Sequence, residues 1–174
     1  DVSNACAGMF TGVYLADAFL KAGSIDRALI CSGEYITHLA TTAQRESEGF
    51  MDARIACLTL GDAGAAVILE RGTDPEIGFK QLNLQTYGRY SPLCIGRVAE
   101  TGGWVMHTDA VNLAEVAIKA GSKYALDQLS QAGWSPESID HLILHQTSRT
   151  TINGAQHEIS SLLNRNVFDK VNLV

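Results

Sequence analysis

The stretch DVSNACAGMFTGVYLADAF, residues 1–19, places a cysteine at the start of an apolar run with the composition of a buried helix. Cys6 lies between Ala5 and Ala7, and Gly8 follows, so small side chains leave room around its thiol. The free N–H groups and the dipole at a helix N-terminus stabilise a thiolate and can hold the oxygen of an acyl intermediate. The residues suggest a thiol that a substrate can reach, although a lone cysteine among small residues is more often structural.

Outward from this segment, the pattern predicts an alternation of helices and short strands. We expect a helix over 4–21, ended at 22–24, and an exposed loop or short helix over 36–52. A tight turn is expected at 61–64, and an irregular, glycine-rich region over 88–108. Further helices are expected over 109–131 and 150–163, and strands over 27–32, 56–60, 65–70, 77–87 and 141–145. This order indicates a layered α/β fold.

The chain divides best at Arg71-Gly72-Thr73-Asp74-Pro75, a run of turn-forming residues. We expect residues 1–72 to be the later part of an N-terminal half that carries the cysteine nucleophile. Residues 73–174 are then the first part of a C-terminal half. The sequence lacks an initiating methionine, and both ends have the pattern of strands, so we expect a segment of a longer protein.

Composition limits the class of function. The 174 residues are 46% hydrophobic and carry a formal net charge of -6, which argues against a nucleic-acid-binding protein. There is no apolar run long enough for a membrane span and no signal-peptide pattern. The four cysteines form no CxxC pair, so we expect no metal site, a reducing cytoplasm and a buried, structural role for Cys31 and Cys57. Cys94 fits the same interpretation.

His145 is the second candidate for chemistry. It ends the apolar run HLILH, and the carboxyl ends of strands in α/β folds are where ligand crevices form. Taken alone, a histidine that bonds local backbone is the better interpretation. A cysteine nucleophile and a distant histidine brought together by folding is, however, a known arrangement for acyl transfer. The run GDAGAA, residues 61–66, lacks the ending of a P-loop and the spacing of a dinucleotide fingerprint.

Four segments in order resemble the ketoacyl synthase III branch of the thiolase superfamily. They are DVSNACAG (1–8), RALICSGE (27–34), LTLGDAGAAVILE (58–70) and IDHLILHQTSRTTI (139–152). The resemblance covers nearly the whole chain and implies a thiolase-like layered αβαβα fold, of which this chain is an incomplete segment. It also implies an acyltransferase that condenses an acyl group from acyl-CoA with malonyl-acyl carrier protein and releases carbon dioxide.

The resemblance assigns roles to individual residues. Cys6 would be acylated, and its backbone N–H would contribute to an oxyanion hole. His145 would stabilise the enolate or carbonyl oxygen. Arg54, shortly before the GDAGA turn, would bind the adenine end of coenzyme A. Leu60 would line the acyl pocket.

The chain also departs from the family pattern. Members have an asparagine in a GN(T/S) motif downstream of the histidine, which is expected here beyond Val174, and Asn172 is not assigned that role. Ser148, a candidate substrate contact, replaces the asparagine of an HQAN motif. The loop over 35–53 is longer than expected for the housekeeping enzyme, which suggests a specialised relative. The isolated chain is expected to be inactive.

Three functions stay open from the sequence. The first is decarboxylative condensation in fatty acid or secondary-metabolite biosynthesis. The second hands the acyl group of acyl-Cys6 to an oxygen or nitrogen nucleophile, with His145 as general base. The third is a non-catalytic thiolase-fold subunit. The resemblance implies acyl-CoA as substrate rather than a bound cofactor, an acyl carrier protein as partner, a cytoplasmic homodimer, and no nucleic-acid or membrane partner.

Overall fold

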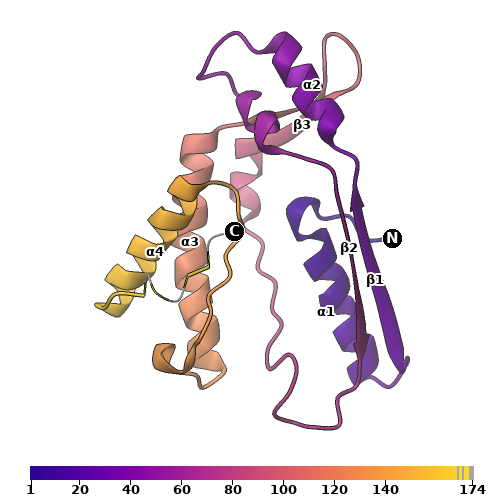
Figure 1. Cartoon of the computed structure of the whole chain (residues 1–174), viewed down its shortest axis with the longest axis vertical. Helices are drawn as coiled ribbons and strands as arrows, with labels where there is room; N and C mark the ends of the chain where they lie inside the picture. The colour runs from indigo at the N-terminus through magenta and orange to yellow at the C-terminus, as the bar shows by residue number, and fades with distance from the viewer. Residues whose placement is uncertain (168, 170, 173–174) are drawn as a thin grey trace.

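The computed structural model describes residues 1–167, 169 and 171–172 (Figure 1). The first part of the chain contains η1 (Ala5–Ala7), α1 (Gly8–Lys21), β1 (Arg27–Glu34), α2 (Thr37–Glu46), η2 (Ile55–Thr59) and β2 (Ala63–Glu70), where η denotes a 3-10 helix. The second part contains η3 (Gly88–Leu93), β3 (Cys94–Val98), β4 (Trp104–Thr108), α3 (Ala110–Gln131), η4 (Pro136–Ser138) and α4 (Arg149–Leu163).

Helix α1 packs along an antiparallel sheet of two strands, β1 and β2 (Figure 1). It ends where expected, because Gly23 adopts a left-handed φ of 70° and the N–H of Ser24 returns to the carbonyl of Phe19. The helix lies close to β1 at Gly12, where an added Cβ would lie 3.1 Å from Ile30 Cγ2. A larger residue at position 12 would therefore require the Ile30 side chain to shift by a few tenths of an ångström.

Only one side of α1 is buried, so the expectation of burial on most faces is wrong. Val13, Ala16 and Leu20 form the buried stripe. Phe10 lies outside this stripe, with 67% of its surface exposed. The sheet is likewise covered on one face. Cys31 alternates with half-buried neighbours and is exposed, which corrects its expected burial.

The sequence suggested that residues 56–60 and 65–70 are strands joined by a tight turn, but β2 does not pair with residues 56–60. Those residues form η2, and β2 pairs instead with β1 in a register that runs from Arg27 opposite Glu70 to Glu34 opposite Ala63. Short apolar runs do not distinguish a strand from a helical turn. Here the helical turn places the Cys57 side chain, fully buried, in a small core. The expected tight turn at 61–64 is absent, since Ala63 and Gly64 already belong to β2.

Residues 94–108 form a β-hairpin, where an irregular region was expected. Strands β3 and β4 pair antiparallel, and Gly102 and Gly103 make the turn with φ of 86° and 85°. The hairpin packs on α2 and η2 around a core of Ala43, Cys57, Ala99 and Val105. A Gly-Gly pair between two short apolar runs is a hairpin signal that could have been recognised.

Helices α3 and α4 pack against one another and match the predicted helices (Figure 1). Asp109 caps α3, with its carboxylate accepting the N–H of Asn112 at 3.2 Å. The expected strand over 141–145 is an extended segment with a single parallel bridge, from Leu142 to Val171. The weak strand expected over 77–87 does not form: residues 77, 78 and 80 are bends and the rest has no regular structure. Both predictions are wrong because a strand is defined by a partner along its length.

Asp62 holds the N-terminus of α2 from a distant part of the chain. Its Oδ1 accepts the N–H groups of Ile36 at 2.6 Å and Thr37 at 2.8 Å. Ile36, the residue at the cap position, supplies no side-chain bond of its own. The two backbone bonds, that of Thr37 first, lower the pKa of Asp62. The acidic residue of the GDAGA run is therefore a tertiary helix cap, a role the sequence alone did not indicate.

We expect Asp62→Ala to lower the midpoint of thermal unfolding by several degrees at neutral pH, and Asp62→Asn by less, since an amide oxygen still accepts. A carboxylate with a lowered pKa stabilises the fold above its ordinary pKa of about 3.9 and loses that contribution as the pH falls. The difference between wild type and Asp62→Ala should therefore shrink below about pH 4. Asp127→Ala, which removes the surface pair with Lys123, is the control. Equal midpoints for Asp62→Ala and that control would contradict this role.

Candidate active site

Cys6 lies in the 3-10 turn η1, immediately before α1, and its side chain is exposed. Ala5, the residue before it, has a φ of 39°, a left-handed conformation that a residue with a Cβ seldom adopts. Such strain is typical of functional turns. The turn therefore presents the thiol outward, at the end of a helix.

The N-terminus of α1 carries no competing anion. Its cap residue, Ala7, makes no side-chain bond to the helix, and the first turn contains no acidic residue. The first N–H groups of a helix lack partners within that helix and attract negative charge. An anion beside Cys6, whether a thiolate or the oxygen of an acyl intermediate, is thus the natural occupant.

Two side chains brace the turn that holds Cys6. The amide of Asn4 donates to Thr11 Oγ1 at 2.9 Å, and that hydroxyl donates to the carbonyl of Ala7, also at 2.9 Å. Asn4 and Ala7 lie on either side of Cys6, so the pair of bonds fixes the backbone around the thiol. Thr11 was missed in the sequence, because nothing in its spacing distinguishes it from an ordinary helical residue.

His145 ends the extended segment that follows η4, and its side chain is exposed. Its carbonyl accepts the N–H of Thr147 at 3.1 Å, which closes a tight turn. The Gln146 amide donates to the carbonyls of Leu144, at 2.9 Å, and Asn172, at 3.2 Å. These bonds tie the turn after the imidazole to the returning chain.

Ser148, a predicted substrate contact, caps α4. Its Oγ accepts the N–H of Thr151 at 3.1 Å and lies 2.9 Å from the Thr151 hydroxyl. The structure thus gives Ser148 a helix-capping role that accounts for a serine at this position. Its contact with substrate stays a prediction.

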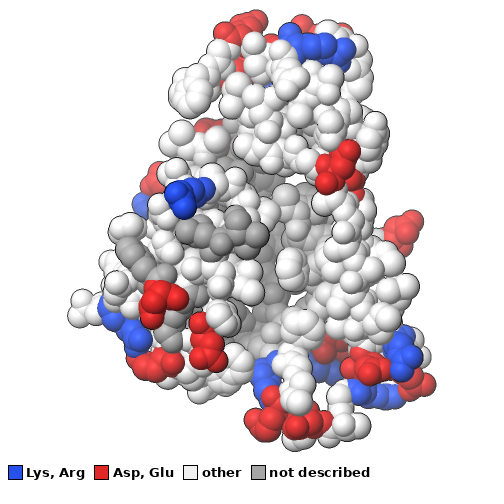
Figure 2. Space-filling view, in the orientation of Figure 1, with Lys and Arg blue, Asp and Glu red and all other residues white. Residues whose placement is uncertain are grey.

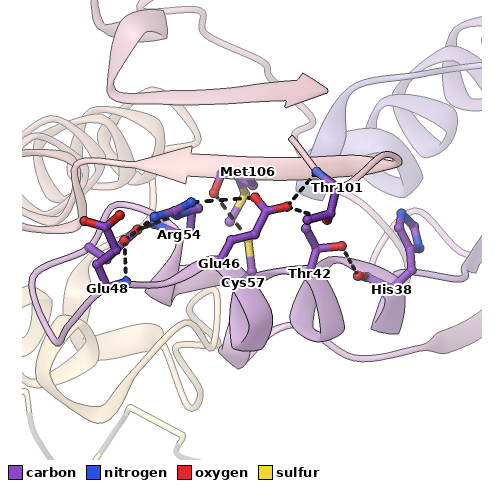
Figure 3. Close-up of polar contacts among 9 residues, drawn as sticks. His38, Thr42, Glu46, Glu48, Arg54, Cys57, Thr101 and Met106 are labelled. Carbon is purple, nitrogen blue, oxygen red and sulfur yellow. Dashed lines mark hydrogen bonds and ion pairs between the residues drawn. The ribbon is translucent and has the colours of Figure 1, made fainter. Parts of the chain in front are cut away.

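Arg54 lies in a cluster of charged side chains rather than free at the surface (Figure 3). Its Nε and Nη2 donate to the two oxygens of Asp52 at 2.8 and 2.6 Å, and Nη1 lies 3.6 Å from Glu46 Oε2. The bond from Arg54 chiefly holds the pKa of Asp52 well below its usual range, and Asp52 raises the pKa of Arg54. Arg54 is therefore a firmly held cation, and its role toward substrate stays a prediction.

Leu60 is half-buried at the end of η2, where its N–H bonds the carbonyl of Cys57 at 3.2 Å. No described hollow identifies an acyl pocket beside it. One hollow of about 450 Å³ is lined by Gly133, Trp134, Ser135 and Ser138. A second, of about 30 Å³, is apolar and lies between α3, α4 and η4. Neither lining contains a predicted site residue.

The predicted residues fall into three places. Arg54 and Leu60 share η2 and its ends, whereas Cys6 and His145 lie on other elements. Within the described ranges, no hydrogen bond or ion pair joins Cys6 to His145. On the face shown in Figure 2, charged side chains gather mainly at the upper and lower ends, and the hollow between them is mostly uncharged.

Two features are absent from the residues that the structure describes. No group of three or more His, Cys, Asp or Glu side chains in that part of the chain is arranged to hold a metal ion. No described helix is both long and apolar enough to cross a membrane.

Comparison with known sequences agrees with the motifs. A family model described as 3-oxoacyl-[acyl-carrier-protein (ACP)] synthase III matches residues 1–88. The chain is 28% identical, over 92% of its length, to beta-ketoacyl-[acyl-carrier-protein] synthase III of Laribacter hongkongensis. It is 27% identical, over 95% of its length, to the enzyme of that name from Alkalilimnicola ehrlichii. It spans about half of these relatives, 48% and 50%.

Solved structures show the same fold. OleA of Xanthomonas campestris, in a structure with bound lauric acid and lauroyl-CoA, matches with a TM-score of 0.79 and 23% identity. That match covers 100% of this chain and 51% of OleA. The synthase III of Thermus thermophilus matches with a TM-score of 0.74 and 17% identity, over 95% of this chain and 49% of that one. The predicted thiolase-like fold is therefore confirmed. The boundary between residues 72 and 73 stays a prediction.

Proposed function

Because this chain belongs to the 3-oxoacyl-[acyl-carrier-protein] synthase III family, we propose that its protein condenses an acyl group with malonyl-acyl carrier protein, with loss of carbon dioxide. The acyl donor is acyl-CoA, and the pathway is fatty acid or secondary-metabolite biosynthesis. The name of the relatives supports the carrier protein, and lauroyl-CoA bound to OleA supports the acyl donor.

The observation that carries the proposal is the position of Cys6. Its thiol is exposed in a braced turn, before a helix whose N-terminus has no side-chain cap. The Cys6 thiolate attacks the thioester carbonyl, the bond to the sulfur of coenzyme A breaks, and coenzyme A leaves as the thiol after taking a proton. The backbone N–H of Cys6, which the family pattern places in an oxyanion hole, stabilises the oxyanion formed in that step.

His145 acts in the second half of the reaction. Loss of carbon dioxide from the malonyl group leaves an enolate, whose oxygen accepts a hydrogen bond from the imidazole. The enolate carbon attacks the acyl carbonyl, the bond to Cys6 Sγ breaks, and the 3-oxoacyl chain remains on the carrier. The imidazole stabilises charge that develops only in this half, so His145 contributes little to the acylation of Cys6.

The proposed oligomeric state and cellular location are those that the family resemblance implies. We propose a homodimer in the cytoplasm that uses acyl-CoA and an acyl carrier protein and needs no bound cofactor or metal. The length of the acyl chain is left to experiment, because no described hollow shows the shape of an acyl pocket.

The test is carbon dioxide release by the full-length protein given acyl-CoA and malonyl-acyl carrier protein labelled at the free carboxylate. We expect labelled carbon dioxide that requires both substrates. Formation of acyl-Cys6 without release of label, followed by transfer to an alcohol or amine, would establish the alternative transferase. If the protein formed no acyl-Cys6 and released no label, it would be identified as a non-catalytic subunit.

A further inference from the structure

The charged cluster around Arg54 joins two parts of the chain that are distant in sequence, residues 46–54 and Thr101. Glu46 ends α2, Asp52 lies in the following loop, Arg54 precedes η2, and Thr101 lies in the β3–β4 turn (Figure 3). The three charged side chains are largely shielded, with 8% of Glu46, 11% of Asp52 and 16% of Arg54 exposed. This shielding distinguishes the cluster from the exposed pairs on α3.

Asp52 fixes the plane of the guanidinium. It accepts from Nε and Nη2 in the forked geometry that matches a carboxylate to an arginine. Its Oδ1 also accepts the backbone N–H of Arg54 at 2.8 Å, and Oδ2 that of Glu48 at 3.0 Å. The same carboxylate therefore fixes the backbone conformation of the loop at Glu48 and of the start of η2 at Arg54.

Glu46 links this arginine to the hairpin. Its Oε2 faces Arg54 Nη1, while its Oε1 accepts the backbone N–H of Thr101 at 3.1 Å and the Thr101 hydroxyl. The Thr101 hydroxyl is the largest of the influences that lower the pKa of Glu46. Glu46 is thus a charged carboxylate that bridges Arg54 and the β3–β4 turn.

We propose that Glu46 is a positioning residue for the acyl donor, holding the Arg54 guanidinium in place for the nucleotide end of coenzyme A. This inference rests on the proposed function, and on the role in binding coenzyme A that the family resemblance implies for Arg54. It adds Glu46 and Thr101 to the residues that set donor affinity. Replacing Glu46 by glutamine keeps the size of the side chain. The amide either presents its N–H groups to Nη1, which repels the guanidinium, or turns around and loses the bonds from Thr101.

The experiment compares two donors with one acyl group, acyl-CoA and the acyl thioester of N-acetylcysteamine, which lacks the nucleotide. For Glu46→Gln in the full-length protein, we expect the KM for acyl-CoA to rise about tenfold with kcat unchanged. The kcat/KM for the short thioester should stay within about twofold of wild type. Thr101→Val should move the KM for acyl-CoA in the same direction by less, because the backbone N–H of residue 101 remains.

A double variant separates positioning from simple stability. If Glu46 acts through Arg54, then Glu46→Gln adds no further rise in KM once Arg54 is alanine. Glu115→Gln, which breaks an exposed pair with Lys119 on α3, is the matched control. It should change neither the KM for acyl-CoA nor the kcat/KM for the short thioester. Equal losses with both donors, an unchanged KM for acyl-CoA, or additive effects in the double variant would overturn the inference and leave the proposed function intact. No acylation of the wild-type protein by either donor would overturn both.

Discussion

Replacing Cys6 by alanine is expected to abolish turnover of the full-length protein, with kcat reduced by at least about 10⁴-fold. The thiolate is the group that becomes acylated, and none of the other three cysteines directly precedes an α-helix. Without a covalent acyl group, malonyl-acyl carrier protein has no electrophile to attack. Initial rates of 3-oxoacyl product formation measure the effect.

The chain offers a matched control for this substitution. Cys31 is also exposed, but it lies on the open face of β1 rather than at a helix N-terminus. Cys31→Ala should keep the wild-type rate within about twofold. Cys57 is a poorer control because it is fully buried, where burial raises the pKa of its thiol. Loss of turnover in Cys31→Ala, or activity retained in Cys6→Ala, would contradict the assignment of the nucleophile.

Replacing His145 by alanine is expected to lower the condensation rate by about 10²–10⁴-fold and to leave acylation of Cys6 nearly unchanged. The imidazole is proposed to act on the enolate oxygen, which appears only after the malonyl group loses carbon dioxide. The acylated protein should therefore accumulate on addition of acyl-CoA and persist when malonyl-acyl carrier protein follows. Rapid-quench mass measurement of both half-reactions checks this split.

His157→Ala supplies the comparison for that result. His157 is exposed on α4, where its Nδ1 lies 2.7 Å from the carbonyl of Asn153. Its loss should affect neither half-reaction by more than about twofold. If His145→Ala slowed acylation as much as condensation, the imidazole would serve as a base for Cys6, and the proposed division of labour would be wrong.

The sequence predicts best those parts whose signal is local. The small and apolar run after Cys6 predicted α1, and Gly23 predicted its end. The periodic run before Gln131 predicted α3, because a helix forms its hydrogen bonds within one segment. Cys6 and His145 stood out for the same reason, since each lies at a recognisable junction between a strand or turn and a helix.

Features that depend on distant partners were missed. The apolar run at 56–60 has the composition of a strand, but Cys57 enters a core completed by Val105 far along the chain. Cys31 is exposed because α1 covers only one face of the sheet, which its strand-like neighbours do not reveal. The roles of Asp62 and Glu46 rest on bonds to Thr37 and Thr101, so no spacing within either segment could have indicated them.

The most direct test of the account is the intact mass of the full-length protein after incubation with a panel of acyl-CoA thioesters. We predict a gain of one acyl group, located by peptide mapping to the segment that contains Cys6 and absent from Cys6→Ala. The preferred donor would give the chain length of the substrate. A protein that gains no acyl group from any donor or from acyl-carrier protein, or gains it at another residue, would contradict the claim that Cys6 is the acyl acceptor.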